Sequence, residues 1–444
     1  MHPGSTQIGA GEGGWRAAVV KGLRELREAK AAKFLRDLSR ALLWQLLGKL
    51  LQVVGFAYAC RCLGPANVGL SGTVLVTAMF VQLVLDFGLD IISVRHVAGK
   101  TIALADITPA ILSLRFLTAL VVAALWLVVL ACAPIDGTTR FVWALGAAHL
   151  LFLNLNFNWF YQATENMPTF SMIQNLISVA GSVYFLVFFH SGQAAGSDLL
   201  VIMILNAVGT VATWCWLHQR RGLRLFAWRS LVLAGRLFKE GRPTWAFNLC
   251  YYALSTMGLP LCNYLLGEQG NRESGYFRSA MLVVGALQVF LSYFALMLNP
   301  RIVAWRQTEP HRFRHRIFLL VAGLCLASVA VFAGLWFLRR PIFLLLFGRD
   351  FLPGAAVLPV LVAAKFLAVA SGITVWGLFA YHRDWLAVRC VAVPTVALFL
   401  LHWWLVPRFG ILAAAGLNFL GEFVLLIFCF VAFSRVEGRS QPAT

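Results

Sequence analysis

Residues 45–64 (QLLGKLLQVVGFAYACRCLG) and 248–267 (NLCYYALSTMGLPLCNYLLG) align without a gap. The two stretches share Leu46/Leu249, Leu51/Leu254, Gly55/Gly258, Leu63/Leu266 and Gly64/Gly267. Each is long and apolar enough to cross a membrane as a helix. Because one copy lies in each half of the chain, the sequence predicts a doubled unit of membrane helices.

Each copy carries a single polar stripe on an otherwise apolar helix. The polar positions are Gln45, Lys49 and Gln52 in the first copy, and Asn248, Tyr252, Ser255 and Asn263 in the second. Spacings of four and seven residues place side chains on one face of a helix. Two matched polar faces predict a substrate cavity between the halves of a transporter, although hydrogen bonding between helices is the alternative.

The composition requires a membrane protein. The chain has 444 residues, of which 60% are hydrophobic and 12% charged, and its mean hydropathy is +0.79. Twelve apolar runs have the length of a membrane span. They lie near 41–60, 68–89, 108–132, 139–160, 168–190, 198–218, 244–266, 277–300, 317–338, 354–380, 386–405 and 410–434. We therefore expect an all-α polytopic membrane protein with two pseudo-symmetric six-helix lobes around a central cavity.

The distribution of basic residues predicts the orientation. If the N-terminus is cytosolic, the cytosolic segments carry 25 Lys and Arg residues and the outer segments carry seven. This contrast follows the positive-inside rule and predicts that both termini are cytosolic. The net charge of +19 then reflects orientation and contact with anionic lipid headgroups, and nucleic acid is not expected as a partner.

The predicted domains follow from these runs. Residues 1–40 should form a disordered tail and a cytosolic amphipathic helix, followed by an N-terminal lobe (41–218) and a C-terminal lobe (244–434). The basic segment 219–243 is the expected cytosolic linker, and 435–444 the cytosolic tail. Nine cysteines lie singly in or beside apolar runs, so we expect neither a metal site nor a cofactor.

Seven local patterns resemble one family over about residues 40–434. They are RCLGPANVG (61–69), DFGLDIISVRHVAGK (86–100), WFYQATE (159–165), GYFRSAMLV (275–283), LNPRI (298–302), FGRDFLPGA (347–355) and FGILAAAGLNFLGE (409–422). In this order and spacing they resemble the polysaccharide transporter (Wzx-type) family, in the superfamily that includes multidrug (MATE-like) exporters. Ala163 departs from the family pattern, as do Leu412 and Ala413.

The resemblance implies a flippase of the bacterial cytoplasmic (inner) membrane. Such a protein translocates an undecaprenyl-diphosphate-linked oligosaccharide repeat unit by alternating access, for O-antigen, capsule or exopolysaccharide biosynthesis. Its expected partners are the lipid-linked glycan, membrane lipids, and a polymerase and other assembly proteins. An unpaired diphosphate is very costly inside a membrane, so the path should offer cations and hydroxyl or amide groups.

Three cations are candidates for contact with the diphosphate. Lys49 lies near the middle of the first span, Arg278 begins the eighth span, and Arg61 lies at the outer mouth of the first. Snorkelling to an interface is the alternative for Lys49 and Arg278, and a role in topology or loop structure is the alternative for Arg61. Counted from the pair Gly69/Gly275, Arg278 is the repeat equivalent of Gly72. Gln45, Gln52, Asn248, Tyr252 and Asn263 are the expected partners of sugar or phosphate oxygens.

Charged residues elsewhere in the spans have simpler interpretations. Glu422 and Lys365 both lie near the middle of the membrane, and we expect a structural ion pair, with ion coupling at Glu422 as the alternative. Arg115 is expected to snorkel to the cytosolic interface. Asp86 and Asp90 flank the inner end of the second span, where a structural elbow is expected.

Three other functions remain open on sequence alone. A peptidoglycan lipid-precursor flippase would also need cations, but it usually has two further spans. A MATE-type cation or drug exporter would need anionic groups in its cavity. A membrane polysaccharide polymerase or glycosyltransferase would need catalytic outer loops, and the predicted outer loops are short and poor in carboxylates. We therefore do not expect an enzyme.

Overall fold

The computed structural model describes residues 12–440 apart from 165, 223–225, 228–229, 309 and 382. Side chains are described from residue 47 onward, with short interruptions. The further positions at which only the backbone is described are 98, 167–168, 220–221, 292–294, 296–297, 299–301, 303–304, 306–308, 310–311, 380 and 437–440. Within the described part, all regular structure is helical.

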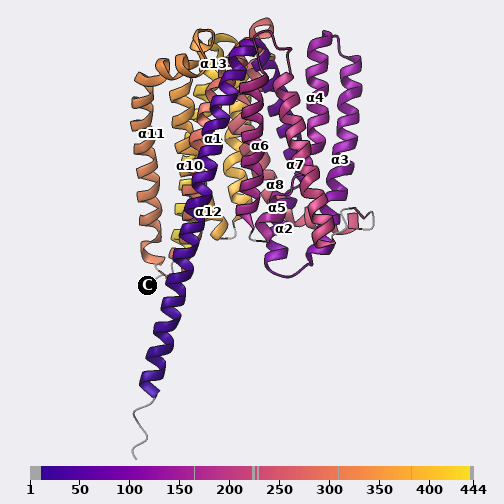
Figure 1. Ribbon diagram of the computed structural model, residues 1–444. Coiled ribbons are helices and arrows are strands. Elements are labelled where there is room, and N and C mark those ends of the chain that lie inside the picture. Colours follow the sequence, from indigo (N-terminus) through magenta and orange to yellow (C-terminus); the bar gives the residue numbers. More distant parts are fainter. Residues whose placement is uncertain are drawn as a thin grey trace, which may run out of the picture.

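The helices follow one another through short connections (Figure 1). The first half contains α1 (Glu12–Asp86), α2 (Leu89–Ala98), α3 (Leu104–Cys132), α4 (Gly137–Asn154), α5 (Asn158–Ala163), α6 (Met167–Phe188) and α7 (Ser197–Arg221). The second half contains α8 (Leu231–Thr256), α9 (Gly258–Leu265), η2 (Gly267–Gln269), α10 (Gly270–Thr308), α11 (Pro310–Leu346), η3 (Arg349–Ala356), α12 (Leu358–Ala380) and α13 (Asp384–Ser440). We call these halves the first and second lobe.

Nine segments of the described chain are long and apolar enough to span a membrane. Two of them contain a glycine with a non-helical backbone, Gly64 (φ 75°, ψ 164°) and Gly410 (φ 60°, ψ −146°). Each of these glycines divides its segment into two spans. Together with α8 and α9, which cover the predicted seventh span, the segments account for the twelve predicted spans.

The repeat equivalence is visible in the backbone. Gly64 ends the first copy with φ 75°, and Gly267 ends the second copy with φ 55°. Glycine adopts this left-handed conformation without the steric cost that a Cβ atom brings. The same residue type therefore ends the same span in both lobes, and the doubled unit is confirmed.

Two predicted segment boundaries differ from the helices observed. α8 begins at Leu231, inside the predicted linker 219–243, and continues into the seventh span. Gly241 of α8 packs against the backbone carbonyls of Phe87 and Gly88, so the helix begins against the first lobe. At the start of the chain, α1 begins at Glu12 and continues into the first span. The interfacial location of residues 15–40 remains a prediction.

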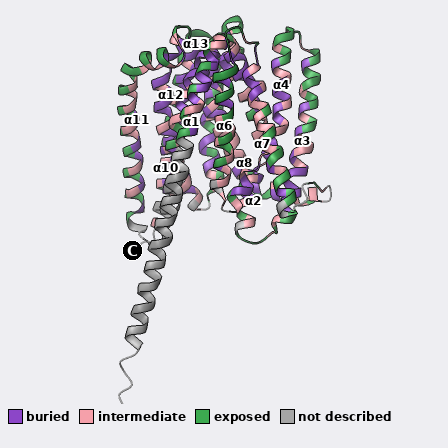
Figure 2. Cartoon of the chain, viewed as in Figure 1, coloured by how far each residue is buried: buried purple, intermediate pink, exposed green. Residues whose placement is uncertain are grey.

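At one end of the bundle the two lobes share an apolar core. We call the end with the turns at Gly64, Gly267, Gly348 and Gly410 the Gly64 end, and the opposite end the α2 end. At the Gly64 end one apolar core joins both lobes, with Phe56 and Val68 from α1 packed together with Phe277 and Phe347. Figure 2 shows buried residues concentrated there.

At the α2 end the lobes have separate apolar cores. One core of the first lobe contains Ile107, Trp159 and Leu217, and it also includes Leu237 from the start of α8. The core of the second lobe contains Phe313 and Phe433. The large apolar side chains on the outer surface, such as Phe337 at 81% exposure, are those expected to face lipid. The fold therefore has one apolar core shared by both lobes at the Gly64 end. At the α2 end the cores are separate, and the start of α8 packs against the first lobe.

Candidate functional site

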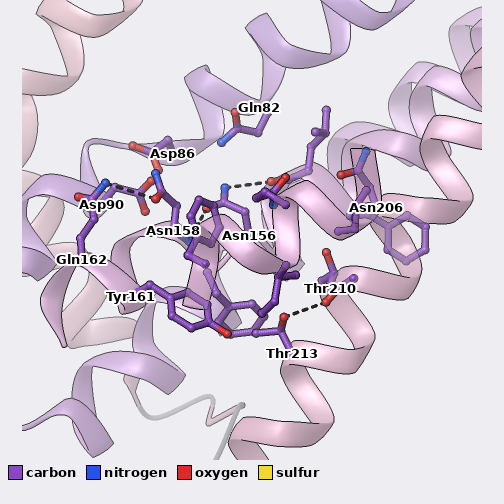
Figure 3. A pocket seen from close by; sticks show the side chains of 18 of the residues that line it. Gln82, Asp86, Asp90, Asn156, Asn158, Tyr161, Gln162, Asn206, Thr210 and Thr213 are labelled. Carbon is purple, nitrogen blue, oxygen red and sulfur yellow. Dashed lines mark hydrogen bonds between the residues drawn. The ribbon is translucent and has the colours of Figure 1, made fainter. Parts of the chain in front are cut away.

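A polar cavity of about 580 Å³ lies within the first lobe, towards the α2 end. Its walls come from α1, α2, α4, α5, α6 and α7, together with Asn248 of α8. Figure 3 shows polar side chains from several helices around it. The polar lining residues are Gln82, Asp86, Asp90, Asn156, Asn158, Tyr161, Gln162, Gln174, Asn206, Thr210, Thr213 and Asn248. Among its lining residues that the structure describes there is no Lys, Arg or His. We call this space the first-lobe cavity.

A second cavity of about 330 Å³ lies in the other lobe. It is formed by α8, α10 and α12, and its lining is more apolar. Lys365 of α12 lines it together with Gln288, Tyr251 and Ser371. Ile91 and Asn248 line both cavities, so the two spaces adjoin between the lobes. We call this space the second-lobe cavity.

The acidic residues of the first-lobe cavity are positioned by a tight turn. Phe87 (φ 53°) and Gly88 (φ 71°) both have left-handed backbone and connect α1 to α2. Such a conformation is unusual for a residue with a side chain. The Phe87 ring packs edge-on against Phe238 at 5.3 Å, which holds the turn against α8. This turn brings Asp86 and Asp90 to the same side of the first lobe.

Both carboxylates bind Arg115 of α3, whose side chain is fully buried. Its Nη2 donates hydrogen bonds to Oδ1 of Asp86 and to Oδ1 of Asp90, the second at 2.7 Å. Asn154 donates to the backbone carbonyl of Arg115 at 2.7 Å. The expectation that Arg115 snorkels is therefore wrong, because two acidic partners satisfy its charge inside the lobe. Arg115 does not line the cavity, whereas both aspartates do.

Arg278 lies at the Gly64 end in a buried cluster that joins the lobes. Its Nη1 donates to Asp198 Oδ2 at 3.1 Å, to Ser71 Oγ at 2.6 Å and to the carbonyl of Val68 at 2.8 Å. The guanidinium lies over the Phe56 ring, 4.7 Å from its centroid. We call Ser71, Asp198 and Arg278 the Arg278 cluster. It lies apart from both cavities, since none of the three lines either of them.

The repeat-related glycines Gly69 and Gly275 touch across the lobe interface. A Cβ atom on Gly69 would overlap the carbonyl oxygen of Asn271, and one on Gly275 would overlap that of Pro65. A Cβ atom on Gly72 would likewise overlap the Arg278 side chain. Equivalent positions of two related halves meet in this way close to a pseudo-twofold axis. The absence of side chains at these glycines is therefore what lets α1 and α10 approach closely.

Arg61 also connects the lobes at the Gly64 end. Its guanidinium donates to the carbonyls of Leu344, Leu345 and Leu346, with Nε to Leu346 O at 2.9 Å. These carbonyls end α11 and have no partners within their helix, so a cation there is favourable. Arg61 and Arg278 thus both take part in closing this end.

The remaining predicted cavity residues lie on several interfaces. Lys49 is half-buried and has no ion pair with another described residue, and Gln52 Oε1 is buried without a described hydrogen-bond partner. Tyr252 stacks on Phe80 across the lobe interface, with ring centroids 6.3 Å apart. Asn263 donates to Asn271 Oδ1 at 2.6 Å. The side chain of Gln45 lies outside the described residues. Among the described side chains of the two polar stripes, only Asn248 lines the first-lobe or the second-lobe cavity.

Glu422 and Lys365 lie in the second lobe without a direct contact. Glu422 is fully buried and accepts a hydrogen bond from Ser255 at 2.8 Å, and its Oε2 has no partner among the described residues. The described ion pairs do not include Glu422 with Lys365, which lines the second-lobe cavity instead. Whether the two act as a pair is still a prediction.

Several residues of the first-lobe cavity are not among those predicted from the sequence. Asn206, Thr210 and Thr213 occupy positions i, i+4 and i+7 of α7, the same spacing that drew attention to the first span. Asn156 lies between α4 and α5 and Asn158 begins α5, in a stretch rich in asparagine. The helical-phase rule, applied to every span, would have found the α7 group.

Residues 34–304, more than half of the chain, match the family described as polysaccharide biosynthesis protein. The chain belongs to this family. No curated protein matches this chain significantly.

Solved structures of a flippase and of MATE transporters share the fold at low sequence identity. "Lipid II flippase MurJ, inward closed conformation" has a TM-score of 0.68 and 12% identity, covering 89% of this chain and 87% of the other. An inward-facing multidrug resistance MATE transporter has a TM-score of 0.68 and 12% identity, covering 88% and 96%. An outward-facing multidrug resistance MATE transporter has a TM-score of 0.61 and 12% identity, covering 92% of this chain and 97% of the other. This polysaccharide biosynthesis protein is thus a multi-pass membrane protein with a transporter fold.

Proposed function

We propose that the protein is a flippase of the bacterial cytoplasmic (inner) membrane for an undecaprenyl-diphosphate-linked oligosaccharide. It would carry this lipid from the cytosolic to the outer leaflet for the assembly of an O-antigen, capsule or exopolysaccharide. The observation that carries the proposal is the pair of adjoining cavities, one rich in amides and hydroxyls and the other containing a cation. Membership of the polysaccharide biosynthesis family supports the same substrate class.

Each cavity suits one part of such a lipid. Seven side-chain amides and three hydroxyls line the first-lobe cavity, and these groups bind sugar hydroxyls, while the Tyr161 ring offers an apolar face. Lys365 in the second-lobe cavity offers a positive charge for the diphosphate. The prenyl tail can remain in lipid beside the protein. The glycan and the diphosphate would thus occupy neighbouring cavities that meet at Asn248.

The contacts between the lobes support alternating access. The Gly64 end is closed by the Arg278 cluster, by Arg61 and by the Gly69–Gly275 approach. The cavities lie towards the α2 end, where the lobes have separate cores. If the α2 end is cytosolic, as the positive-inside rule indicates, this is the inward-facing state that accepts substrate. Outward opening would require the contacts at the Gly64 end to separate.

The orientation gives a topology prediction. The segment 219–243 should be cytosolic because it carries seven basic residues, and 191–197, which carries none, should be outside. Alkaline phosphatase fused in the 191–197 loop should be active, and the same reporter fused after Gly222 should be inactive. A fluorescent protein that requires the cytosol should give the reverse pattern. Opposite results would overturn the twelve-span orientation.

The function is tested by deletion and by reconstitution. Deleting the gene in its host should abolish the surface polysaccharide and cause the lipid-linked repeat unit to accumulate. That lipid, extracted and labelled, should be flipped by the purified protein in proteoliposomes. Lys365→Ala should lower flipping at least ~tenfold at normal protein level, while Lys365→Arg, which keeps the charge, should retain more activity. Normal polysaccharide in the deletion strain would overturn the proposal.

The same assay resolves the role of Glu422. If Lys365 and Glu422 form only a structural pair, Lys365→Met and Glu422→Gln should each lower the amount of folded protein, and the double variant should recover folding and transport. If Lys365 binds the diphosphate, the double variant should fold and remain inactive. We expect the inactive outcome, because Lys365 lines a cavity and makes no direct contact with Glu422. Recovery of transport would favour the structural pair.

A second candidate function is export of organic cations. Asp86 and Asp90 on the wall of the first-lobe cavity favour it, because two carboxylates face one buried arginine. A cation exporter would lower sensitivity to cationic dyes when overproduced, and this effect should vanish in Asp90→Asn. Unchanged dye sensitivity together with loss of polysaccharide on deletion would exclude this candidate.

A further inference from the structure

The first-lobe cavity is polar and acidic, and its described lining contains no cation. Its described lining has two carboxylates, seven amides and three hydroxyls. Asp86 is nearly buried, and the Asp90 side chain is 27% exposed, so Asp90 is the more accessible of the two. A ligand that fills this space therefore meets a wall carrying negative charge.

Arg115 holds the two carboxylates but does not neutralise both. One guanidinium charge faces two carboxylate charges, which leaves a net charge of −1 on the three groups. The arginine lies behind the wall, fully buried, and both aspartates present their side chains to the cavity. The sign of the local field is therefore negative on the side where a glycan would bind.

The cation for a diphosphate lies in the other cavity. Lys365 lines the second-lobe cavity, and the two cavities share Ile91 and Asn248. A lipid-linked glycan placed across this junction would have its anionic diphosphate by Lys365 and its sugars by Asp90. The cationic Lys365 would then face the anionic diphosphate, and the acidic wall would face the sugars. A glycan that is itself anionic would be repelled by this wall.

We propose that the first-lobe cavity determines which glycans are transported by their charge. It favours a sugar with a protonated free amine, accepts a neutral sugar, and rejects a sugar with a carboxylate. The amine would bind the Asp90 carboxylate while the amides and hydroxyls bind ring hydroxyls. A carboxylate would be repelled by Asp86 and Asp90 and would find no cation in the described lining. This inference rests on the proposed flippase function and names its substrate class.

The test uses three synthetic prenyl-diphosphate disaccharides that differ in the terminal sugar. This sugar is glucosamine, N-acetylglucosamine or glucuronic acid. Flipping by the full chain is measured in proteoliposomes, and binding in detergent. We expect glucosamine to exceed glucuronic acid at least ~tenfold in both measurements, with N-acetylglucosamine between them. Asp90→Asn should reduce this ratio to within ~threefold, and Asp90→Glu, which keeps the charge, should preserve it.

Asp106→Asn is the matched control. Asp106 is exposed at the start of α3, outside the cavity lining, and its change removes the same charge from the protein. The ratio should be unaffected in this variant, because its charge does not reach the ligand. Equal flipping of all three probes by the wild type would overturn the charge selection and leave the flippase function standing. Failure to flip or bind any probe would overturn the proposed function and the inference with it.

Discussion

Gly275→Ala is expected to abolish transport, while Gly285→Ala on the same helix is expected to be tolerated. A Cβ atom at Gly275 would overlap the backbone carbonyl of Pro65, whereas one at Gly285 meets no atom within 4 Å. A backbone atom cannot move aside as a side chain does, so α1 and α10 would have to separate. Overpacking of this kind costs ~1–3 kcal/mol in protein cores.

Transport should fall at least ~tenfold in Gly275→Ala, because the proposed alternating-access cycle includes closure of the Gly64 end. The melting temperature in detergent should fall as well. Gly285→Ala should keep transport and raise the melting temperature slightly, since alanine is favoured over glycine inside a helix by ~1 kcal/mol. Gly69→Ala should behave like Gly275→Ala, because its Cβ atom would overlap the carbonyl of Asn271. Normal transport in both variants would show that close approach at this interface is not required.

The large-scale fold was predictable because its causes are local. The length of each apolar run determines a span, and the repeated span ending at Gly64 and Gly267 revealed the doubled unit. The pair Gly69/Gly275 also makes Gly72 and Arg278 equivalent positions of the two repeats, which the sequence alone indicates. The structure shows why this pairing matters, since Gly72 leaves the space that the Arg278 side chain fills.

The cavity was less predictable because helical phase does not identify the neighbour. Lys49 lies on the polar face of the first span, and Tyr252 and Asn263 lie on that of the seventh. Such a face can pack against another helix as readily as it can line a cavity. Asn263 meets Asn271, and Tyr252 meets Phe80. The partners of Arg115 lie 25 and 29 residues away, across a turn that depends on Phe87 in a left-handed conformation. Spacing within one span carries no information about such contacts.

Arg115→Met is expected to reduce strongly the amount of folded protein. The side chain of Arg115 is fully buried, and its loss would leave Asp86 and Asp90 without the cation that binds both. Removing one partner of a buried ion pair typically costs ~3–5 kcal/mol, because the remaining charge stays unpaired at low dielectric. Fluorescence-detected size-exclusion and melting in detergent would measure the loss. Arg140→Met, at an exposed arginine that donates to the carbonyls of Ala133 and Ile135, is the control and should have a small effect.

A compensating change separates the structural role of Arg115 from the charge of the cavity. Arg115→Met with Asp86→Asn removes one positive and one negative charge, so the wall keeps its net charge of −1 through Asp90. This double variant should recover much of the folded protein, because the more buried of the two carboxylates no longer needs a partner. It should also keep the preference for an amine over a carboxylate, since Asp90 still faces the cavity. If Arg115→Met alone folds normally, Arg115 is not needed to hold the acidic wall. If the double variant folds but loses its preference, selection depends on the positions of the carboxylates and not on their net charge.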